Sequence, residues 1–362
     1  MKIAIDISPL SSGHRVRGIG SYVSMLKENL ETYDKKNSYV FFTNKNVPKD
    51  ADLVHFPYFD PFFPVLPFSK KIKTVVTVHD LIPIVHGNEF PIGIKGNLRW
   101  LYNKQLLKRV NTIVTDSYAS KEDIVKFAGI DEKKVKVVYL AVDPAFRILN
   151  TKYLIPNTRK KFSLPENFFL YVGDATWNKN LPRLVEAFKQ TSHKLVMVGK
   201  VWAPPQTPSQ RTLSGGRGSA PEGEINSNPW NRDLKHTLAN TKNDKQFIHL
   251  GFVETEDLVK IYNLAAALVM PSLDEGFGLP VLEAMSCGCP VITSREGSLP
   301  EVGGDAVLYA DSYSEESITK AINDLDSNLK LRESLIKKGV EQAEKFTIKK
   351  SILDLVSVYE DV

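Results

Sequence analysis

Cysteine is scarce in this chain, since Cys287 and Cys289 are the two cysteines among 362 residues. They flank Gly288 where a helix is expected to end, so the sequence predicts no disulfide framework and favours a reducing, cytoplasmic location. Long apolar runs are also missing. None approaches the roughly 20 residues that a membrane-spanning helix needs, and the residues from Met1 indicate the start of a strand and not a signal peptide.

Acidic residues are few in the first part of the chain. Residues 1–150 contain 22 Lys and Arg against 15 Asp and Glu, a surplus of seven, whereas the whole chain carries a net charge of +5. A basic half suits anionic partners such as a membrane surface, a lipid diphosphate or a nucleic acid, and a solvated surface explains the surplus equally well. The length suits two domains.

Short apolar segments recur along the chain, and a helical pattern follows each of them. Val, Ile and Leu fill these segments almost continuously, which is typical of parallel strands buried on both faces. Two such sets in tandem predict two Rossmann-like, doubly wound α/β domains, which we place at 1–155 and 156–345. Residues 346–362 are expected to form a helix that crosses back to the first domain. The predicted strands are 2–6, 39–43, 53–56, 74–79, 112–116, 135–142, 168–172, 194–198, 246–251, 266–270, 290–293 and 306–309.

Residues 201–230 interrupt this alternation. They contain two consecutive prolines, two consecutive glycines and many Ser, Thr and Asn residues. Such a composition predicts a loop, which is either a featureless insertion or a lid over the ligand-binding edge of the second sheet.

Residues 271–291 carry the most informative pattern, because they combine a strand end, a glycine-rich turn, a short helix and the next strand. Gly276 and Gly278 let the backbone run close to a ligand, and the amide groups that open the helix can face an anion. Glu275 and Glu283 lie on either side and can accept hydrogen bonds from hydroxyl groups. A ligand that fits this pattern has phosphate groups between two groups of hydroxyls, and a nucleotide-sugar is such a ligand.

Two loops of the first domain are expected at the carboxyl ends of its strands, where open α/β sheets bind ligands. Arg17, Gly18 and Gly20 open a helix after the first strand, where they either approach an oxyanion or simply make a turn. His79 follows a buried strand and could contact a sugar hydroxyl or developing charge. In the second domain, Lys179 follows the first strand and can pair with a diphosphate as a point charge.

These segments together resemble glycosyltransferase family 4, whose members are retaining, metal-independent enzymes of the two-domain GT-B fold. The resemblance covers residues 17–22, 78–83, 115–124, 171–188, 251–257 and 271–310. It implies that Glu283 holds the ribose, that Lys179 neutralises the diphosphate, and that His79 contacts the sugar from the first domain. It further implies that Glu275 and the backbone amides of Gly276, Phe277 and Gly278 hold the transferred sugar. The remaining donor-binding candidates are Leu279, Gly173, Asn178, Gly18, Gly20 and Arg17.

One position departs from the family pattern. Many relatives have arginine immediately before the lysine that matches Lys179, whereas this chain has Asn178. This departure calls into question one phosphate contact that the resemblance implies, and Arg15 or Arg17 could supply it instead. The Asp-x-Asp triplet at 324–326, which in other sugar transferases holds a divalent ion, lies in a polar helical stretch, so no metal site is predicted.

The resemblance implies transfer of a hexosyl group from a nucleoside diphosphate sugar to the hydroxyl of a glycan or lipid-linked glycan. The sequences of the motifs are similar to those of bacterial mannosyltransferases of surface-polysaccharide assembly, which favours GDP-mannose as donor. No cofactor and no nucleic-acid partner are predicted. Two alternatives remain open: a two-Rossmann sugar-nucleotide epimerase, and a non-catalytic protein that binds sugar-nucleotides or glycans.

A peripheral contact with an anionic membrane, on the inner face of the plasma membrane, is a separate hypothesis. In residues 98–110, Leu98, Tyr102, Leu106 and Val110 form one i, i+4 stripe. Trp100 and Leu107 lie roughly opposite, near lysine residues. We expect one stripe to face the core, while the other meets either a bilayer or a second packing partner.

Overall fold

The computed structural model describes residues 1–11, 18–43, 46–66, 72–150, 155–202 and 231–362. Internal contacts divide the chain into two compact units, of which unit 1 contains Met1–Ala141 and Phe346–Val362 and unit 2 contains Val142–Lys345. The sequence analysis ended the first domain at residue 155, and the contacts place the division earlier. The reason is that residues after Ala141 pack within unit 2, where the Leu149 amide donates to Asn263 at 2.8 Å.

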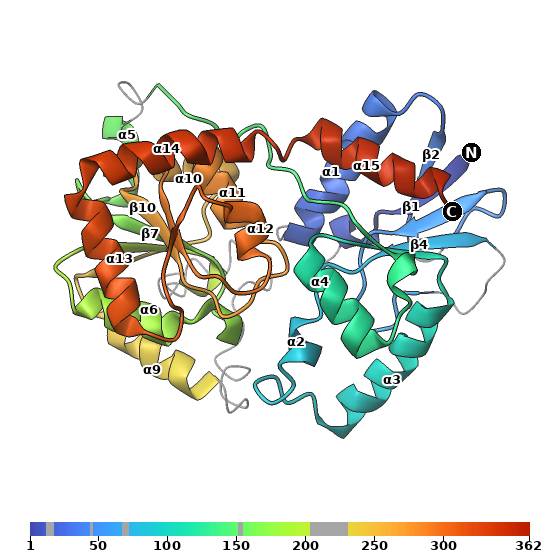
Figure 1. Cartoon of the computed structure of the whole chain (residues 1–362), viewed down its shortest axis with the longest axis horizontal. Coiled ribbons are helices and arrows are strands. Elements are labelled where there is room, and N and C mark those ends of the chain that lie inside the picture. The colour runs from blue at the N-terminus through green and yellow to red at the C-terminus, as the bar shows by residue number, and fades with distance from the viewer. Residues whose placement is uncertain (12–17, 44–45, 67–71, 151–154, 203–230) are drawn as a thin grey trace, which may run out of the picture. The chain divides into compact units, whose positions relative to one another are not determined.

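Unit 1 is built on a sheet of six parallel strands in the order β2-β1-β3-β4-β5-β6 (Figure 1). Strands β3 and β5 are buried along their whole length, because helices cover both faces of the sheet and leave no polar face in the sequence pattern. The strands are β1 (Lys2–Asp6), β2 (Ser38–Phe42), β3 (Leu53–Phe56), β4 (Lys73–Thr77), β5 (Thr112–Thr115) and β6 (Val135–Val137).

The helices of unit 1 are α1 (Gly18–Tyr33), α2 (Ile82–Val85), α3 (Gly93–Arg109), α4 (Tyr118–Asp123) and α15 (Ile348–Glu360). Shorter helical turns are Ser8–Ser11, Ile124–Ala128 and Glu132–Lys134. Helix α15 comes from the last part of the sequence and packs against α1. Its Tyr359 is fully buried and hydrogen bonds to the Nδ1 atom of His55 on β3 at 2.7 Å. The final helix is therefore part of the core of unit 1.

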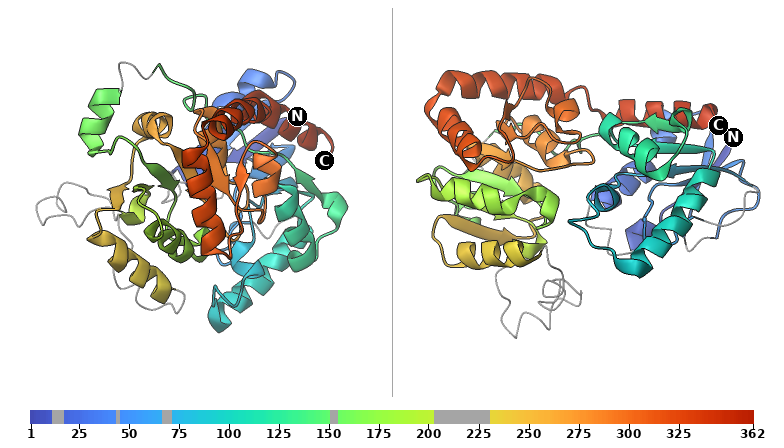
Figure 2. Two further views of the ribbon diagram at one scale, coloured as in Figure 1. Left: turned by 60° about the vertical axis from the view of Figure 1, so that its left-hand side comes forward. Right: turned by 60° about the horizontal axis from the view of Figure 1, so that its bottom comes forward.

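Unit 2 repeats the plan with six parallel strands in the order β12-β11-β10-β7-β8-β9. Figure 2 shows this unit, with its helices around the sheet, from two further directions. The strands are β7 (Phe169–Val172), β8 (Leu195–Val198), β9 (Phe247–Gly251), β10 (Ala267–Met270), β11 (Val291–Thr293) and β12 (Leu308–Tyr309). The helices are α5 (Ile155–Phe162), α6 (Leu181–Lys189), α9 (Asn231–Lys242), α10 (Thr255–Leu264), α11 (Leu279–Ser286), α12 (Leu299–Gly303), α13 (Glu315–Ser327) and α14 (Leu329–Ala343), with short turns at Trp177–Lys179 and Lys200–Trp202.

The prediction of two doubly wound parallel α/β domains is confirmed, since each of the twelve predicted segments overlaps a strand. The segment at 135–142 is shorter than predicted, because the strand ends at Val137 and an irregular connection follows. The predicted loop at 201–230 begins inside the core, where Trp202 is fully buried and its Nε1 donates to the Gly173 carbonyl at 3.1 Å. Residues 203–230 lie outside the described part of the chain.

Candidate functional site

The glycine-rich turn of unit 2 connects the buried strand β10 to helix α11. Gly278 is the residue that makes the turn, because its φ of +98° lies in the left-handed region and places it at the N-cap of α11. Pro280 then occupies the first turn of the helix, where its missing amide hydrogen costs nothing. Glu275 precedes this turn and Leu279 begins the helix, so the predicted donor-binding residues lie on one continuous segment.

Glu275 and Lys179 are directly paired. The Nζ atom of Lys179 lies 2.7 and 2.8 Å from the two carboxylate oxygens of Glu275, and the Ser272 hydroxyl donates to Oε1 at 2.6 Å. The two side chains are only 16% and 8% exposed, so each charge depends on the other for compensation. The sequence assigned them to different parts of the ligand. The structure joins them in one ion pair beside the turn.

The backbone of Glu275 is held by the loop that precedes α12. The amide and the hydroxyl of Ser298 both donate to the Glu275 carbonyl, at 3.1 and 2.9 Å. Gly297 allows this approach, because a Cβ atom there would lie 2.5 Å from the Asp274 side chain and 2.7 Å from the Glu275 amide nitrogen. Ser272, Gly297 and Ser298 were missed by sequence reasoning. No signal identified their contacts with the Glu275 loop, because these contacts join loops that are separate in the sequence.

Two asparagines hold the Lys179 loop against the Glu275 loop. The Asn178 amide group donates to the Asp274 carbonyl at 3.0 Å, and the Asn178 carbonyl accepts from the Leu273 amide at 2.7 Å. The Asn180 amide group donates to the Pro271 carbonyl at 3.0 Å. Asn178 thus acts on the position of the loop that carries Glu275. Asn180 stands at the N-cap of α6, although its side chain does not cap that helix.

Glu283 lies on α11, one turn after the helix begins. The Tyr262 hydroxyl donates to its Oε2 atom at 3.0 Å. Burial raises the pKa of Glu283 to about 7, and Asp143 adds to this rise while the Tyr262 hydrogen bond opposes it. The carboxyl group is consequently half ionised near neutral pH. A ligand with hydroxyl groups would favour its charged form, because a carboxylate is the stronger hydrogen-bond acceptor.

In unit 1, His79 follows β4 and Asp116 follows the neighbouring strand β5. The Nδ1 atom of His79 lies 2.6 Å from Oδ2 of Asp116, and the ring of Tyr22 on α1 meets the imidazole edge-on at a centroid distance of 5.1 Å. Burial alone would lower the pKa of His79, but the charge and hydrogen bond of Asp116 outweigh it, with smaller help from Asp80 and the Pro57 carbonyl. The pKa of His79 is therefore raised.

Asp116 is a residue that sequence reasoning missed. It lies 37 positions from His79 and is nearly fully buried. The available signal was the adjacency of the two strands, since the carboxyl ends of parallel neighbours meet at one edge. The other predicted residues of unit 1 lie at the start of α1, which begins at Gly18 and buries Gly20. Arg17 and Arg15 lie outside the described residues.

Metal-binding groups are dispersed. Within the described ranges, no three His, Cys, Asp or Glu side chains come together as a metal site requires. Asp324 of the Asp-x-Asp triplet pairs with Lys320, and Asp326 accepts from Asn167 at 3.2 Å. Cys287 and Cys289 are buried free thiols whose pKa values burial raises. Among the helices that the structure describes, none is long and apolar enough to cross a membrane.

Comparison with known proteins identifies the family. The profile described as Glycosyl transferases group 1 matches residues 155–342, and that of Glycosyltransferase Family 4 matches residues 15–146. The chain belongs to the group 1 glycosyltransferases. The match to the first profile contains the Lys179 loop, Glu275 and Glu283, and the match to the second contains His79 and Asp116. This glycosyltransferase therefore has the GT-B fold.

Individual relatives agree with this assignment. The glycosyltransferase is 28% identical over 291 residues to O-antigen chain mannosyltransferase B of Escherichia coli, a match that covers 80% of this chain and 70% of that protein. It is 30% identical over 241 residues to the serotype-specific mannosyltransferase WbdA of Escherichia coli, covering 64% of this chain but only 26% of WbdA. Sucrose-phosphate synthase of Thermosynechococcus elongatus has a similar fold, with a TM-score of 0.73, 18% identity and coverage of 100% and 98%.

Asp116→Asn is expected to reduce transfer at neutral pH by about a hundredfold, the usual contribution of a positioned acid or base. An amide cannot hold His79 protonated, so the pKa of His79 should fall. Any limb of the pH–rate profile that reflects loss of the His79 proton should then move to lower pH. The profile of the purified variant, with the His79 pKa followed by NMR, measures both effects.

Asp34→Asn is the matched control for this experiment. Asp34 is an equally buried carboxylate of unit 1 that accepts hydrogen bonds from Tyr39 and Asn37 and does not contact His79. Its replacement should lower stability without moving the pH–rate profile. An unchanged His79 pKa in Asp116→Asn would show that the carboxylate does not control the imidazole.

Proposed function

We propose that this glycosyltransferase transfers a mannosyl group from GDP-mannose to a hydroxyl of a growing glycan or lipid-linked glycan, with retention of configuration and without a metal ion. The observation that carries the donor site is the cluster of Lys179, Glu275 and Ser272 beside the turn at Gly278, with Glu283 on the helix that follows. The named mannosyltransferases among the relatives support the choice of sugar.

The proposed roles follow from the chemistry of each group. Glu283 accepts hydrogen bonds from the ribose hydroxyls, and its ionisation accompanies binding. Lys179 faces the diphosphate, so that it stabilises the charge that develops on the leaving group. Glu275 and the backbone at Gly276–Gly278 hold the transferred sugar. His79 contacts the sugar from unit 1, as the protonated partner of Asp116.

The proposed reaction is a front-face displacement. The bond between the anomeric carbon and the phosphate oxygen breaks, and the acceptor oxygen forms its bond on the same face. The acceptor proton passes to the departing phosphate oxygen, so that GDP leaves as the second product. Lys179 must therefore be free to reach the phosphate, and this requires the ion pair with Glu275 to open or to be shared when the donor binds.

A donor screen followed by product analysis tests this proposal. GDP-mannose is expected to raise the unfolding midpoint of the protein more than UDP-, ADP- or dTDP-sugars do, because a ligand that binds only the native state stabilises it. With a polysaccharide acceptor, NMR should show an α-mannosyl product, and a chelator should leave the rate unchanged. Isomerisation of the donor alone would indicate an epimerase. Binding without turnover across a broad acceptor panel would indicate a binding protein.

A further inference from the structure

Helix α3 of unit 1 presents large apolar side chains to solvent along one face. Each residue of an α-helix is rotated by about 100° around the helix axis from the one before it. Positions 94, 98, 101 and 102 therefore fall within an arc of about 100° around that axis. The opposite side of the helix packs into the core through Trp100, Leu106 and Leu107. The exposed fractions are 82% for Ile94, 62% for Leu98, 55% for Leu101 and 50% for Tyr102.

The stripe predicted from the sequence does not correspond to one face of this helix. Leu98 and Tyr102 are exposed, whereas Leu106 and Val110 are buried. The reason is geometric, because each i, i+4 step overshoots a full turn by about 40° and three steps rotate the stripe by about 120°. Trp100 and Leu107, which were expected on the second stripe, are also buried. The exposed apolar face is therefore the one that contains Ile94 and Leu101.

The charge of this helix has one sign. It carries five basic residues and no acidic residue, and residues 81–110 contain Glu89 as their single acid. Lys95, Arg99 and Lys108 are exposed beside or beyond the apolar face. The Arg99 guanidinium lies over the ring of Phe63 at 5.5 Å, and Phe63 is itself 60% exposed. Phe63 thus extends the apolar face next to a cation.

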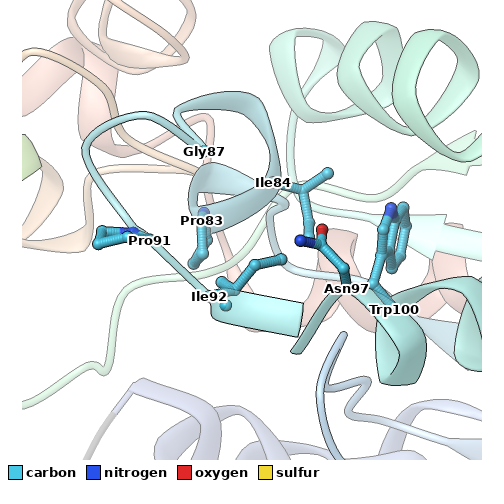
Figure 3. A pocket seen from close by; sticks show the side chains of 8 residues that line it. Pro83, Ile84, Gly87, Pro91, Ile92, Asn97 and Trp100 are labelled. Carbon is cyan, nitrogen blue, oxygen red and sulfur yellow. The ribbon is translucent and has the colours of Figure 1, made fainter. Parts of the chain in front are cut away.

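A cavity of about 280 Å³ opens along the neighbouring side of the same helix (Figure 3). Asn97 and Trp100 of α3 form one wall, and the segment from Pro83 to Ile92 forms the other. Five of the eight residues that line it are aliphatic or aromatic: Pro83, Ile84, Pro91, Ile92 and Trp100. Its size suits the end of a hydrocarbon chain.

We propose that α3, together with Phe63, docks unit 1 on the surface of an anionic lipid bilayer. The apolar side chains would enter the boundary between headgroups and acyl chains, and Lys95 and Arg99 would face the lipid phosphates. A second copy of the chain fits this surface poorly, because a symmetric contact would bring the same basic helices together. The proposal goes beyond the proposed function and holds for any donor sugar.

One consequence rests on the proposed function. Helix α2 begins three residues after His79 and contributes Pro83 and Ile84 to the cavity. A lipid-linked acceptor in the same bilayer would therefore have its lipid held beside α3 and its sugar delivered towards the His79 loop. Loss of bilayer binding would then raise KM for a lipid-linked acceptor and leave KM for GDP-mannose unchanged.

Vesicle flotation of the full chain tests the docking. The wild-type protein is expected to float with vesicles of phosphatidylglycerol and phosphatidylethanolamine, and high salt should weaken this binding. Leu98→Ser combined with Leu101→Ser, and Lys95→Gln combined with Arg99→Gln, should each reduce binding by about tenfold or more. Leu329→Ser, which alters a leucine of unit 2 that is 66% exposed, and Lys337→Gln are matched controls with binding within about twofold of wild type.

Several outcomes would overturn the proposal. Wild-type protein that stays at the bottom of the gradient, or floats equally with phosphatidylcholine at high salt, excludes an anionic bilayer as partner. Equal binding of the α3 variants and the controls places the contact elsewhere. Dimerisation that the Leu98→Ser and Leu101→Ser changes abolish, without any vesicle binding, assigns the surface to a second copy. Thermal unfolding of each variant confirms that it is folded before flotation.

Discussion

Lys179→Met is expected to lower the rate of transfer by a hundredfold or more and to destabilise the protein at the same time. Loss of a preorganised group that faces the leaving group costs about a hundred- to a thousandfold in rate. The stability effect has a different origin. Glu275 is 8% exposed and would lose the charge of Lys179 that pairs with it, and breaking one side of such a pair costs about 3–5 kcal/mol.

The double variant Lys179→Met/Glu275→Gln separates the two effects. It removes both charges, so most of the lost stability should return while transfer stays absent. Denaturant unfolding of the wild type, both single variants and the double variant gives the coupling free energy of the pair. Lys320→Met is the control, because the Lys320–Asp324 pair is exposed and its loss should cost less than about 1 kcal/mol.

Replacing Lys179 and replacing Glu275 are expected to have opposite effects on ligand binding. Glu275→Gln frees the Lys179 ammonium from its carboxylate, so the variant should bind GDP at least as tightly as wild type although it cannot transfer mannose. Lys179→Met should weaken GDP binding. Equal turnover of both variants and the wild type would remove Lys179 and Glu275 from the reaction.

Glu283→Gln is expected to stabilise the protein at pH 8 and to weaken donor binding. The pKa of this carboxyl is about 7 in the folded state, against 4.5 as the ordinary value. As the pH rises from 4.5 to 7, the unfolded chain releases the proton and the folded protein retains it, so stability falls over this window and stays low above it. Glutamine escapes that cost, which amounts to about 3 kcal/mol at most.

The measurement is thermal unfolding at pH 4.5 and pH 8 with and without GDP-mannose. The gain in midpoint should appear at pH 8 and almost vanish at pH 4.5, where the Glu283 carboxyl is protonated in the folded protein and about half protonated in the unfolded chain. Donor affinity should fall by about tenfold or more, because hydrogen bonds to a charged acceptor are lost. Glu341→Gln, on an exposed helix position, should change neither quantity. Equal stability of Glu283→Gln and wild type at pH 8 would contradict the raised pKa.

The sequence predicted the strands well because their signal is local. Segments such as Phe169–Val172 are apolar along their length, and burial on both faces requires no knowledge of the partner strand. The contacts among site residues depend on chain topology. Asp116 reaches His79 only because β4 and β5 are neighbours, and Lys179 reaches Glu275 across 96 positions because two loops meet above the sheet of unit 2.

Side-chain roles at helix ends were harder to predict for a related reason. Ser298 and Glu301 match a capping box, yet the Ser298 hydroxyl donates to the Glu275 carbonyl and not to its own helix. A local pattern cannot show that an acceptor far away in the sequence lies close to the hydroxyl in the folded protein. The prediction for α3 was wrong for another reason. The i, i+4 spacing is correct for a helix, but over four positions such a stripe rotates from the exposed face to the buried face.

The position of α15 has a consequence for how the protein is made. A ribosome produces residues 142–345 before it produces Phe346–Val362, so unit 1 lacks one of its core helices until all of unit 2 has been synthesised. Until then, the Nδ1 atom of His55 on β3 lacks its native hydrogen-bond partner, the Tyr359 hydroxyl. The second sheet is therefore expected to mature first, which reverses the usual N-to-C order of co-translational folding.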